Sequence, residues 1–270
     1  MKASYIIIFI STIILMSTCG KPVDITPEYN LDKDNHKIPK IAFEGKITNL
    51  IDSNCVKVKR TVSIHSNENI YIENAEIIIS DNHGNIEQLQ YVGNGRYQCL
   101  TTVGISDGRV YTMTAKVEGK TYTANLVMPA KPLPIDSVVI VPDENNEGKF
   151  KAIVFAMVHT QFREYYLFQN FVNGKLKNEP DDLLYASNEN LNGKIPGFTL
   201  VEKLNSGDKF TYKYYTITKE VFDYYNGIND QVNSDGGVFS TPPANVVGNI
   251  PDAAGIIQGM YLYTDSLIVP

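Results

Sequence analysis

The sequence has no tryptophan, three cysteines and four histidines among 270 residues. Acidic residues outnumber basic ones by 30 to 24, so the net charge is −6. This net charge argues against nucleic-acid binding, which requires a basic patch. The absence of tryptophan also argues against carbohydrate binding by ring stacking, because the indole ring offers the broadest aromatic face.

Patterns for metal binding and acid–base catalysis are missing too. No two histidines have a spacing such as H-x-x-x-H, and no Cys-x-x-Cys pair occurs. The acidic residues are scattered over turns and strand edges, so no general acid and base can be paired. We therefore predict no catalytic, cofactor-binding or metal-binding residues and no enzymatic activity.

The first 18 residues have the pattern of an export signal. Lys2 precedes the apolar run Tyr5–Met16, which is shorter than the roughly 20 residues that a transmembrane helix needs. Ser17 and Thr18 then stand before Cys19, as in a lipoprotein cleavage box. We predict that Cys19 is acylated and holds the protein at a membrane by lipid alone. The alternative is an ordinary secretory signal with an incidental cysteine.

Residues 19–39 are polar, contain prolines and show no periodicity, so we predict a flexible tether. Beyond Cys19 the mature chain has two cysteines, Cys55 and Cys99. An oxidising compartment permits a disulfide between them. Strand alternation argues against one, because Cys55 is in phase with lysines and Cys99 with Tyr97. A bridge and two free thiols both stay open.

From residue 40 to 130 the sequence predicts one strand after another. The clearest alternation runs through Tyr111, Met113, Ala115 and Val117, and Gly and Asn/Asp turn signals separate the strands. About seven short strands without a helix favour an N-terminal β-sandwich of immunoglobulin or transthyretin type. The proline-rich stretch 129–134 then predicts a linker.

Residues 131–270 predict a second β-rich domain with one short amphipathic helix. The helix is indicated by apolar residues at helical spacing in "KEVFDYYNGINDQV", with Thr218 as its N-cap. The stretch 234–259 is rich in glycine, proline and asparagine, so we expect a loop that returns to a final strand.

Some local patterns have two interpretations. "DENNEG", from Asp143, resembles a calcium loop, but position twelve is Val154, so a hairpin turn is favoured. "GNG", residues 93–95, is typical of a turn rather than a phosphate cradle. His159 could assist a nucleophile in space, although a structural histidine is favoured. The 17 tyrosines suggest either a binding face or, as we favour, strand residues at the edge of a core.

The chain resembles the lipoproteins catalogued as domain of unknown function 4249. The resemblance rests on "FEGKITN" (43–49), "NAEIIISDNHGN" (74–85), "GNGRY" (93–97), "GRVYTMTAKVEGKTYTA" (108–124), "IDSV" (135–138), "GD" (207–208) and "FSTPPANVVGNI" (239–250). It implies a β-rich lipoprotein of a Gram-negative outer membrane without established catalytic residues. It also implies genes that often neighbour TonB-dependent receptors.

We therefore expect a lipid-anchored outer-membrane lipoprotein with a non-catalytic binding role, accessory to a TonB-dependent receptor or transporter. One alternative is a ligand-binding or adhesion lipoprotein that acts alone. The other is an envelope hydrolase, which would need a pocket where His159 or a carboxylate pair meets a nucleophile.

Overall fold

The chain from Pro39 onward is built almost wholly of β-strands. The computed structural model describes residues 39–62, 68–177, 184–189, 191–232, 246 and 248–270. Contacts divide the chain into residues 1–38 and residues 39–270, and every described element belongs to the second unit.

The strands are β1 (Ile41–Thr48), β2 (Cys55–Arg60), β3 (Glu76–Asp81), β4 (Ile86–Gln88), β5 (Gln90–Gly93), β6 (Arg96–Gln98), β7 (Val110–Val117), β8 (Lys120–Val127), β9 (Ile135–Pro142), β10 (Phe150–Met157), β11 (Tyr165–Val172), β12 (Lys175–Leu176), β13 (Leu184–Ser187), β14 (Lys194–Leu204), β15 (Lys209–Ile217) and β16 (Ala254–Ile268). The helices are the 3-10 turn η1 (Ile51–Ser53) and α1 (Lys219–Val232).

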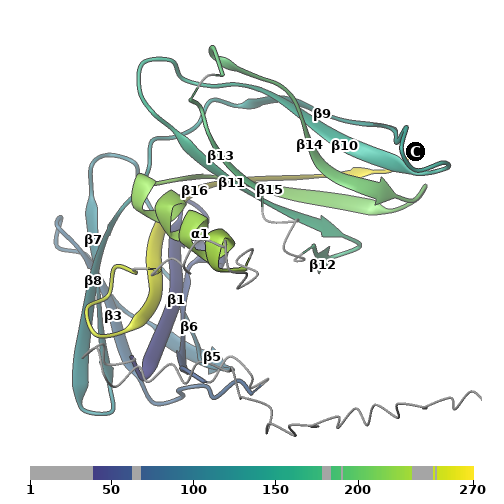
Figure 1. Ribbon diagram of the computed structural model, residues 1–270. Coiled ribbons are helices and arrows are strands. Elements are labelled where there is room, and N and C mark those ends of the chain that lie inside the picture. Colours follow the sequence, from purple (N-terminus) through teal and green to yellow (C-terminus); the bar gives the residue numbers. More distant parts are fainter. Residues whose placement is uncertain (1–38, 63–67, 178–183, 190, 233–245, 247) are drawn as a thin grey trace, which may run out of the picture. The chain divides into compact units, whose positions relative to one another are not determined.

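These strands form three sheets. The largest has the order β12-β11-β15-β16-β1-β2-β6-β5, with β13 also paired to β11. The others have the orders β14-β10-β9 and β4-β3-β7-β8. Figure 1 shows β16, in yellow, which pairs in parallel with β1 and antiparallel with β15.

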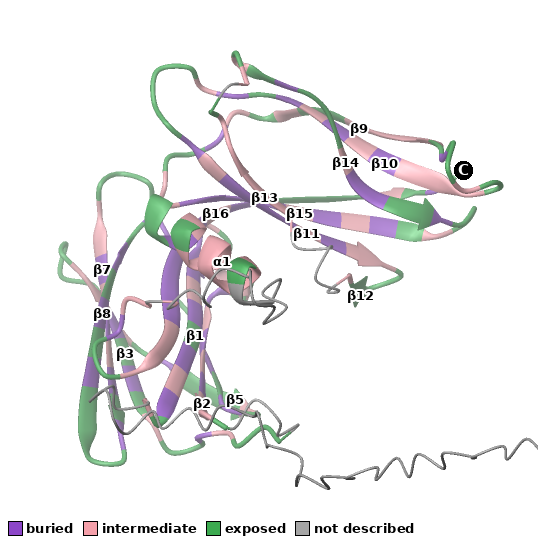
Figure 2. Ribbon diagram, viewed as in Figure 1, coloured by how far each residue is buried: buried purple, intermediate pink, exposed green. Residues whose placement is uncertain are grey.

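Alternating apolar residues create two separate cores. The first lies between β1, β2 and β6 on one side and β3, β7 and β8 on the other, and it includes Phe43, Val56, Ile77 and Met113. The predicted alternation of β7 is confirmed, because Tyr111, Met113, Ala115 and Val117 are all buried. The second core lies between β11 and β15 on one side and β10 and β14 on the other. Figure 2 shows buried and less buried positions following one another along β1.

The predicted mainly β fold with one amphipathic helix is confirmed. Helix α1 spans the residues that the sequence indicated, and the Thr218 hydroxyl accepts a hydrogen bond from the Val221 amide as an N-cap. Val221 and the partly buried Phe222 pack against Leu167, Tyr215 and other residues in a third apolar cluster. This cluster covers the face of β11 and β15 opposite to the second core. None of the described helices is long and apolar enough to cross a membrane.

The prediction of a loop up to residue 259 is wrong, because β16 begins at Ala254. Its glycines, which suggested a loop, are required by close packing. Gly255 has φ +89°, and a Cβ there would overlap the carbonyl oxygen of Phe43 on β1. A Cβ at Gly259 would overlap the carbonyl oxygen of Val127. Glycine therefore allows the strand to lie closer to its neighbours than any other residue would.

Strand β16 pairs with β1, which borders the first core, and with β15, which borders the second. Residues 254–260 pair with β1, whereas residues 260–268 pair with β15. The boundary that the sequence suggested at residue 130 falls between β8 and β9. However, Ile250 and Ile257, from the far end of the chain, lie in the first core. Independent folding of residues 40–130 and the immunoglobulin or transthyretin type both stay predictions.

Two asparagines replace strand partners where β16 changes neighbours. The Asn49 side chain, just after β1, accepts from the Leu262 amide (2.6 Å) and donates to its carbonyl (3.1 Å). The Asn249 side chain does the same at Ile257, with distances of 3.0 and 2.7 Å. Ile257 and Leu262 are an odd number of residues apart, so their backbone groups point to opposite edges of the strand. On each edge of β16, an asparagine side-chain amide thus supplies the hydrogen bonds that the neighbouring strand does not reach.

We predict that Asn49→Ala and Asn249→Ala each lower the free energy of unfolding by about 2 kcal/mol, because each leaves a partly buried backbone amide and carbonyl without partners. Chemical denaturation of the purified chain measures the loss. The control is Asn125→Ala: this exposed side chain accepts a hydrogen bond from the Thr112 hydroxyl, and its loss should change stability by less than about 0.5 kcal/mol. Losses no larger than that of the control would show that β16 does not depend on these amides.

Candidate functional site

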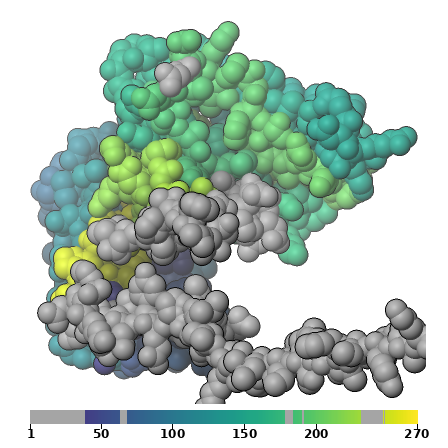
Figure 3. Space-filling model, viewed as in Figure 1, coloured from purple at the N-terminus to yellow at the C-terminus, as the bar shows by residue number. Residues whose placement is uncertain are grey.

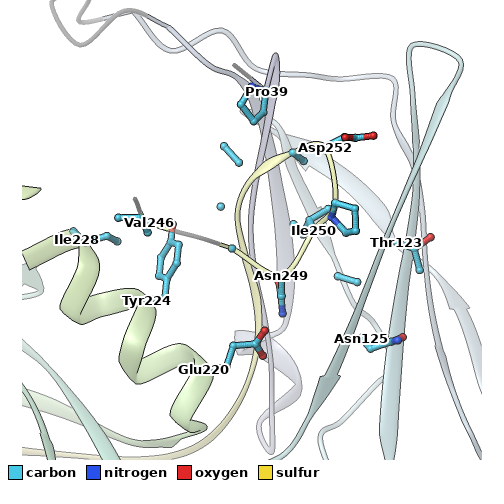
Figure 4. Close-up of a pocket in the computed structure, with 16 residues that line it drawn as sticks. Pro39, Thr123, Asn125, Glu220, Tyr224, Ile228, Val246, Asn249, Ile250 and Asp252 are labelled. Atoms are coloured by element: carbon cyan, nitrogen blue, oxygen red, sulfur yellow. The ribbon is translucent and has the colours of Figure 1, made fainter. Parts of the chain in front are cut away.

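A wide hollow of about 950 Å³ lies beside helix α1. Glu220, Tyr224 and Ile228 of α1 form one wall, and Thr123 and Asn125 of β8 line the other side. The segment from Gly248 to Gly255 crosses between them, as Figure 4 shows around Asn249. In Figure 3, α1 (yellow-green) reaches the surface on the viewed face, next to yellow residues near the C-terminal end of the chain.

The lining of this hollow mixes apolar and polar groups, and the carboxylates of Glu220 and Asp252 make it weakly acidic. Asp252 pairs with Lys120 at 2.9 Å across exposed surface, which contributes little to stability. Burial raises the pKa of the Tyr224 phenol, so this ring presents a neutral hydroxyl. Amide, hydroxyl and carboxylate groups beside an apolar residue such as Ile228 can bind a polypeptide or another polar ligand.

Strand β8 gives the hollow a second property. It is the last strand of its sheet, so among the described residues its outer edge has no strand partner. Thr121, Thr123 and Asn125 alternate with buried residues and are exposed. Open strand edges can pair with an extended segment of another chain, which is a common way to recognise peptides.

His159 belongs to a partly buried hydrogen-bond network and is not an isolated surface residue. Its Nδ1 donates to Glu164 Oε1 at 2.9 Å, since an ionised carboxylate only accepts. Glu164 Oε2 accepts from the Tyr166 hydroxyl (2.7 Å) and from the His159 backbone amide (3.0 Å). The carboxylate is buried, so these three donors compensate its charge. Sequence reasoning selected His159 but missed Glu164.

An open hollow of about 560 Å³ lies beside this network. Its described lining includes one hydroxyl, that of Thr160, and no serine or cysteine. Histidine and acid are thus brought together, but no activated nucleophile accompanies them. The network holds the connection between β10 and β11, where the Asn188 side chain also donates to the carbonyls of His159 and Phe162.

One G-x-S-x-G pattern, Gly104–Gly108, escaped the sequence reasoning. A hydrolase elbow places this serine between a strand and a helix. Here the segment leads into strand β7, and the Ser106 hydroxyl donates to the Pro129 carbonyl at 2.6 Å. Ser106 therefore has a structural contact and lies outside the His159 hollow.

Both cysteines are free thiols: Cys55 begins β2 and Cys99 directly follows β6. Cys99 is buried in the first core, where burial raises the pKa of its thiol to about 12. Cys55 is partly exposed on the other face of the sheet, beside Lys46 and Lys57. The two side chains thus point in opposite directions, as the strand alternation in the sequence indicated when it argued against a disulfide.

The local patterns with two interpretations are turns. Asp143 accepts from Asn145, Asn146 and the Lys203 amide, and it closes the hairpin between β9 and β10. Residues 93–95 form the turn between β5 and β6, all with positive φ. No group of residues that could hold a metal ion occurs in the described part of the chain.

Most of the clustered tyrosines are packed inside the fold. Tyr166, Tyr212 and Tyr214 lie in the second core, whereas Tyr215 lies in the cluster under α1. Neighbouring tyrosines on one strand thus fill both covered faces of the sheet, instead of standing at the edge of one core as the sequence suggested. Tyr263 remains exposed. Cys19, His36, His65, Asp181, Asp182 and the "FSTPPAN" stretch (239–245) lie outside the described residues.

The fold defines a mainly β protein in which paired sheets carry a helix and several surface hollows. The chain belongs to the family described as Domain of unknown function (DUF4249), whose family model matches residues 26–261. The resemblance stated from the sequence motifs is therefore confirmed. No curated protein matches the chain.

We predict that Glu164→Ala lowers the free energy of unfolding by about 3 kcal/mol, because three donors lose a charged acceptor inside the fold. Thermal and urea denaturation measure the loss. Glu189→Ala is the matched control: its carboxylate pairs with Arg163 on the surface, so it should cost less than about 1 kcal/mol. Equal effects of the two substitutions would contradict a structural role of the His159 network.

Proposed function

We propose that the protein is a lipid-anchored lipoprotein of the outer membrane whose role is to bind, without catalysis, as an accessory to a TonB-dependent receptor. The observation that carries this proposal is the hollow beside α1, which adjoins the open edge of β8. A receptor segment in extended conformation would add to the β8 edge and place its side chains in the hollow. The family resemblance, with its implied receptor genes, agrees with such a partner.

The anchor in this proposal is Cys19. Acyl chains each contribute about 0.8 kcal/mol for every buried methylene, so two or three chains keep a protein at a membrane. A protein held in this way is restricted to the membrane surface, where its encounters with a membrane-embedded receptor are frequent. Binding at the hollow can then be weak in solution and still effective.

The His159 network is the one observation that favours a hydrolase instead. Its histidine is oriented by a buried carboxylate, as in catalytic triads. The described lining of its hollow supplies no serine or cysteine for the histidine to activate. We therefore assign the network to structure and keep binding as the function.

We predict that Cys19→Ala moves the protein from the membrane fraction to the soluble fraction of cells, because no acyl chain can be attached. Fractionation with antibody detection measures the distribution. Cys55→Ala is the control and should leave the protein with the membranes. If the Cys19 variant still sediments with the membranes, lipid anchoring at this residue is disproved.

We predict that Thr123→Arg reduces recovery of a barrel receptor with the protein at least fivefold, because the arginine fills the hollow. Thr123 is exposed, so the fold should tolerate the change. The test is co-purification in mild detergent after crosslinking. Thr121→Arg, at the next outward position of β8 but outside the hollow, should leave recovery unchanged.

Two outcomes would contradict the accessory role. If both variants retain the receptor, the hollow is not its binding site. If the wild-type protein recovers no barrel protein, but binds a glycan or a peptide in saturable fashion, the protein acts alone.

A further inference from the structure

A second, smaller hollow of about 230 Å³ lies on the face of the large sheet that is opposite the first core. Its lining comes from six neighbouring strands, β11, β15, β16, β1, β2 and β6, and from helix α1. The residues used below are Lys46, Lys57, Arg96, Tyr215, Tyr225 and Gln258. They come from widely separated parts of the sequence and are brought together by strand pairing.

The hollow gathers positive charge in a chain whose net charge is −6. Lys57 on β2 stands opposite Arg96 on β6, and Lys46 extends from β1 on the same face. Lys213 on β15 adds a further positive charge that acts on Lys46. The one carboxylate in the lining is that of Glu44.

None of these four cations forms a direct ion pair among the described residues, although the charge of Glu44 acts on Lys46. The ion pairs of the described chain lie elsewhere. Lys57 and Lys213 instead lie over the rings of Tyr71 and Phe171. A cation over an aromatic ring keeps its full charge and can still bind an anion.

Lys46 is partly buried and contacts Tyr215. Its Nζ donates to the Tyr215 hydroxyl at 3.3 Å and lies 5.2 Å from the centre of that ring. The Tyr215 hydroxyl itself donates to Gln169 Oε1 at 3.0 Å. Burial, and then the charge of Lys213, lower the pKa of Lys46. An anion in the hollow would reverse both effects, because it would neutralise the charge that burial and repulsion disfavour.

Gln258 provides an independent sign of a ligand. Its side chain is buried, its Nε2 donates to the Tyr225 hydroxyl at 3.4 Å, and its Oε1 has no hydrogen-bond partner. A buried carbonyl oxygen without a donor costs about 1–3 kcal/mol. A hydroxyl group of a ligand could donate to it, and with the amide turned over Nε2 would instead face an anion.

We propose that this hollow binds a small soluble organic oxyanion, which carries a carboxylate or phosphate group beside Lys46 and a hydroxyl group near Gln258. At roughly 30 Å³ for each water-sized group, the hollow holds a ligand of about eight non-hydrogen atoms. This site shares no lining residue with the proposed receptor-binding hollow, although both border α1.

The test uses the full chain in mild detergent, with malate and inorganic phosphate as probes. Isothermal titration should give saturable binding of at least one probe at millimolar concentration or below, and Lys46→Met should weaken it at least tenfold. Methionine keeps the buried aliphatic stem, so the fold should persist. Arg96→Gln, at an exposed position, should weaken binding at least threefold. Lys59→Met is the control, on the neighbouring strand β2 and outside the hollow, and should change affinity less than twofold.

The thiol of Cys55 gives a second measurement, because it lines this hollow whereas Cys99 is buried in the core. A bound probe should slow alkylation of Cys55 by neutral iodoacetamide at least threefold. Four results would overturn the proposal. They are no binding of either probe at 10 mM, equal losses of affinity in the Lys46 and Lys59 variants, no protection of Cys55 by a probe, or protection of Cys55 by chloride equal to that by a probe. Equal losses would indicate a diffuse charge effect. Loss of receptor co-purification alone would not bear on this site.

Discussion

The architecture depends on one strand that must serve two sets of neighbours. Along β16, the partner on one edge ends and the partner on the other edge begins near Met260. At such a crossing, the backbone groups on each edge lose their partner for a few residues, and burying them unpaired would be costly. Asn49 and Asn249 solve this problem with side-chain amides that have the donor and acceptor of a peptide group. Both groups of strands are thereby joined through a continuous ladder.

The same crossing positions the hollows. The segment that contains Asn249 runs beside α1 before it enters β16, and it separates the helix from β8. Its path is fixed by the two hydrogen bonds to Ile257 and by Gly248, where a Cβ would overlap the Gly255 carbonyl. The same contacts that hold the start of β16 thus also determine the lining of the large hollow.

Sequence periodicity predicted what depends on local alternation. The faces of β7, the helix after Thr218 and the opposite phases of Cys55 and Cys99 all follow from neighbours two to four residues away. What could not be predicted depends on distant partners. Composition predicts a loop at the start of β16 because glycine is common in turns, whereas Gly255 and Gly259 allow contact with Phe43 and Val127. Similarly, the Lys46–Tyr215 contact joins residues 169 positions apart, and no spacing rule reveals such a pair. Asn49 and Asn249 stood inside the family motifs, but only the pairing of β16 explains their role.

Helix α1 is the element that both proposed sites share. Tyr224 lines the large hollow and Tyr225 the small one, because consecutive helical residues point about 100° apart. The helix is held on the sheet by an apolar cluster around Val221 and Tyr215, and Tyr215 also contacts Lys46. A ligand in the small hollow therefore contacts residues that support the helix. A segment bound in the large hollow contacts the face of the helix that lines that hollow. If the helix position differs between the free and bound states of one site, the affinity of the other must change by the same factor in both directions. With a rigid helix the two sites would be energetically independent, although they adjoin one element.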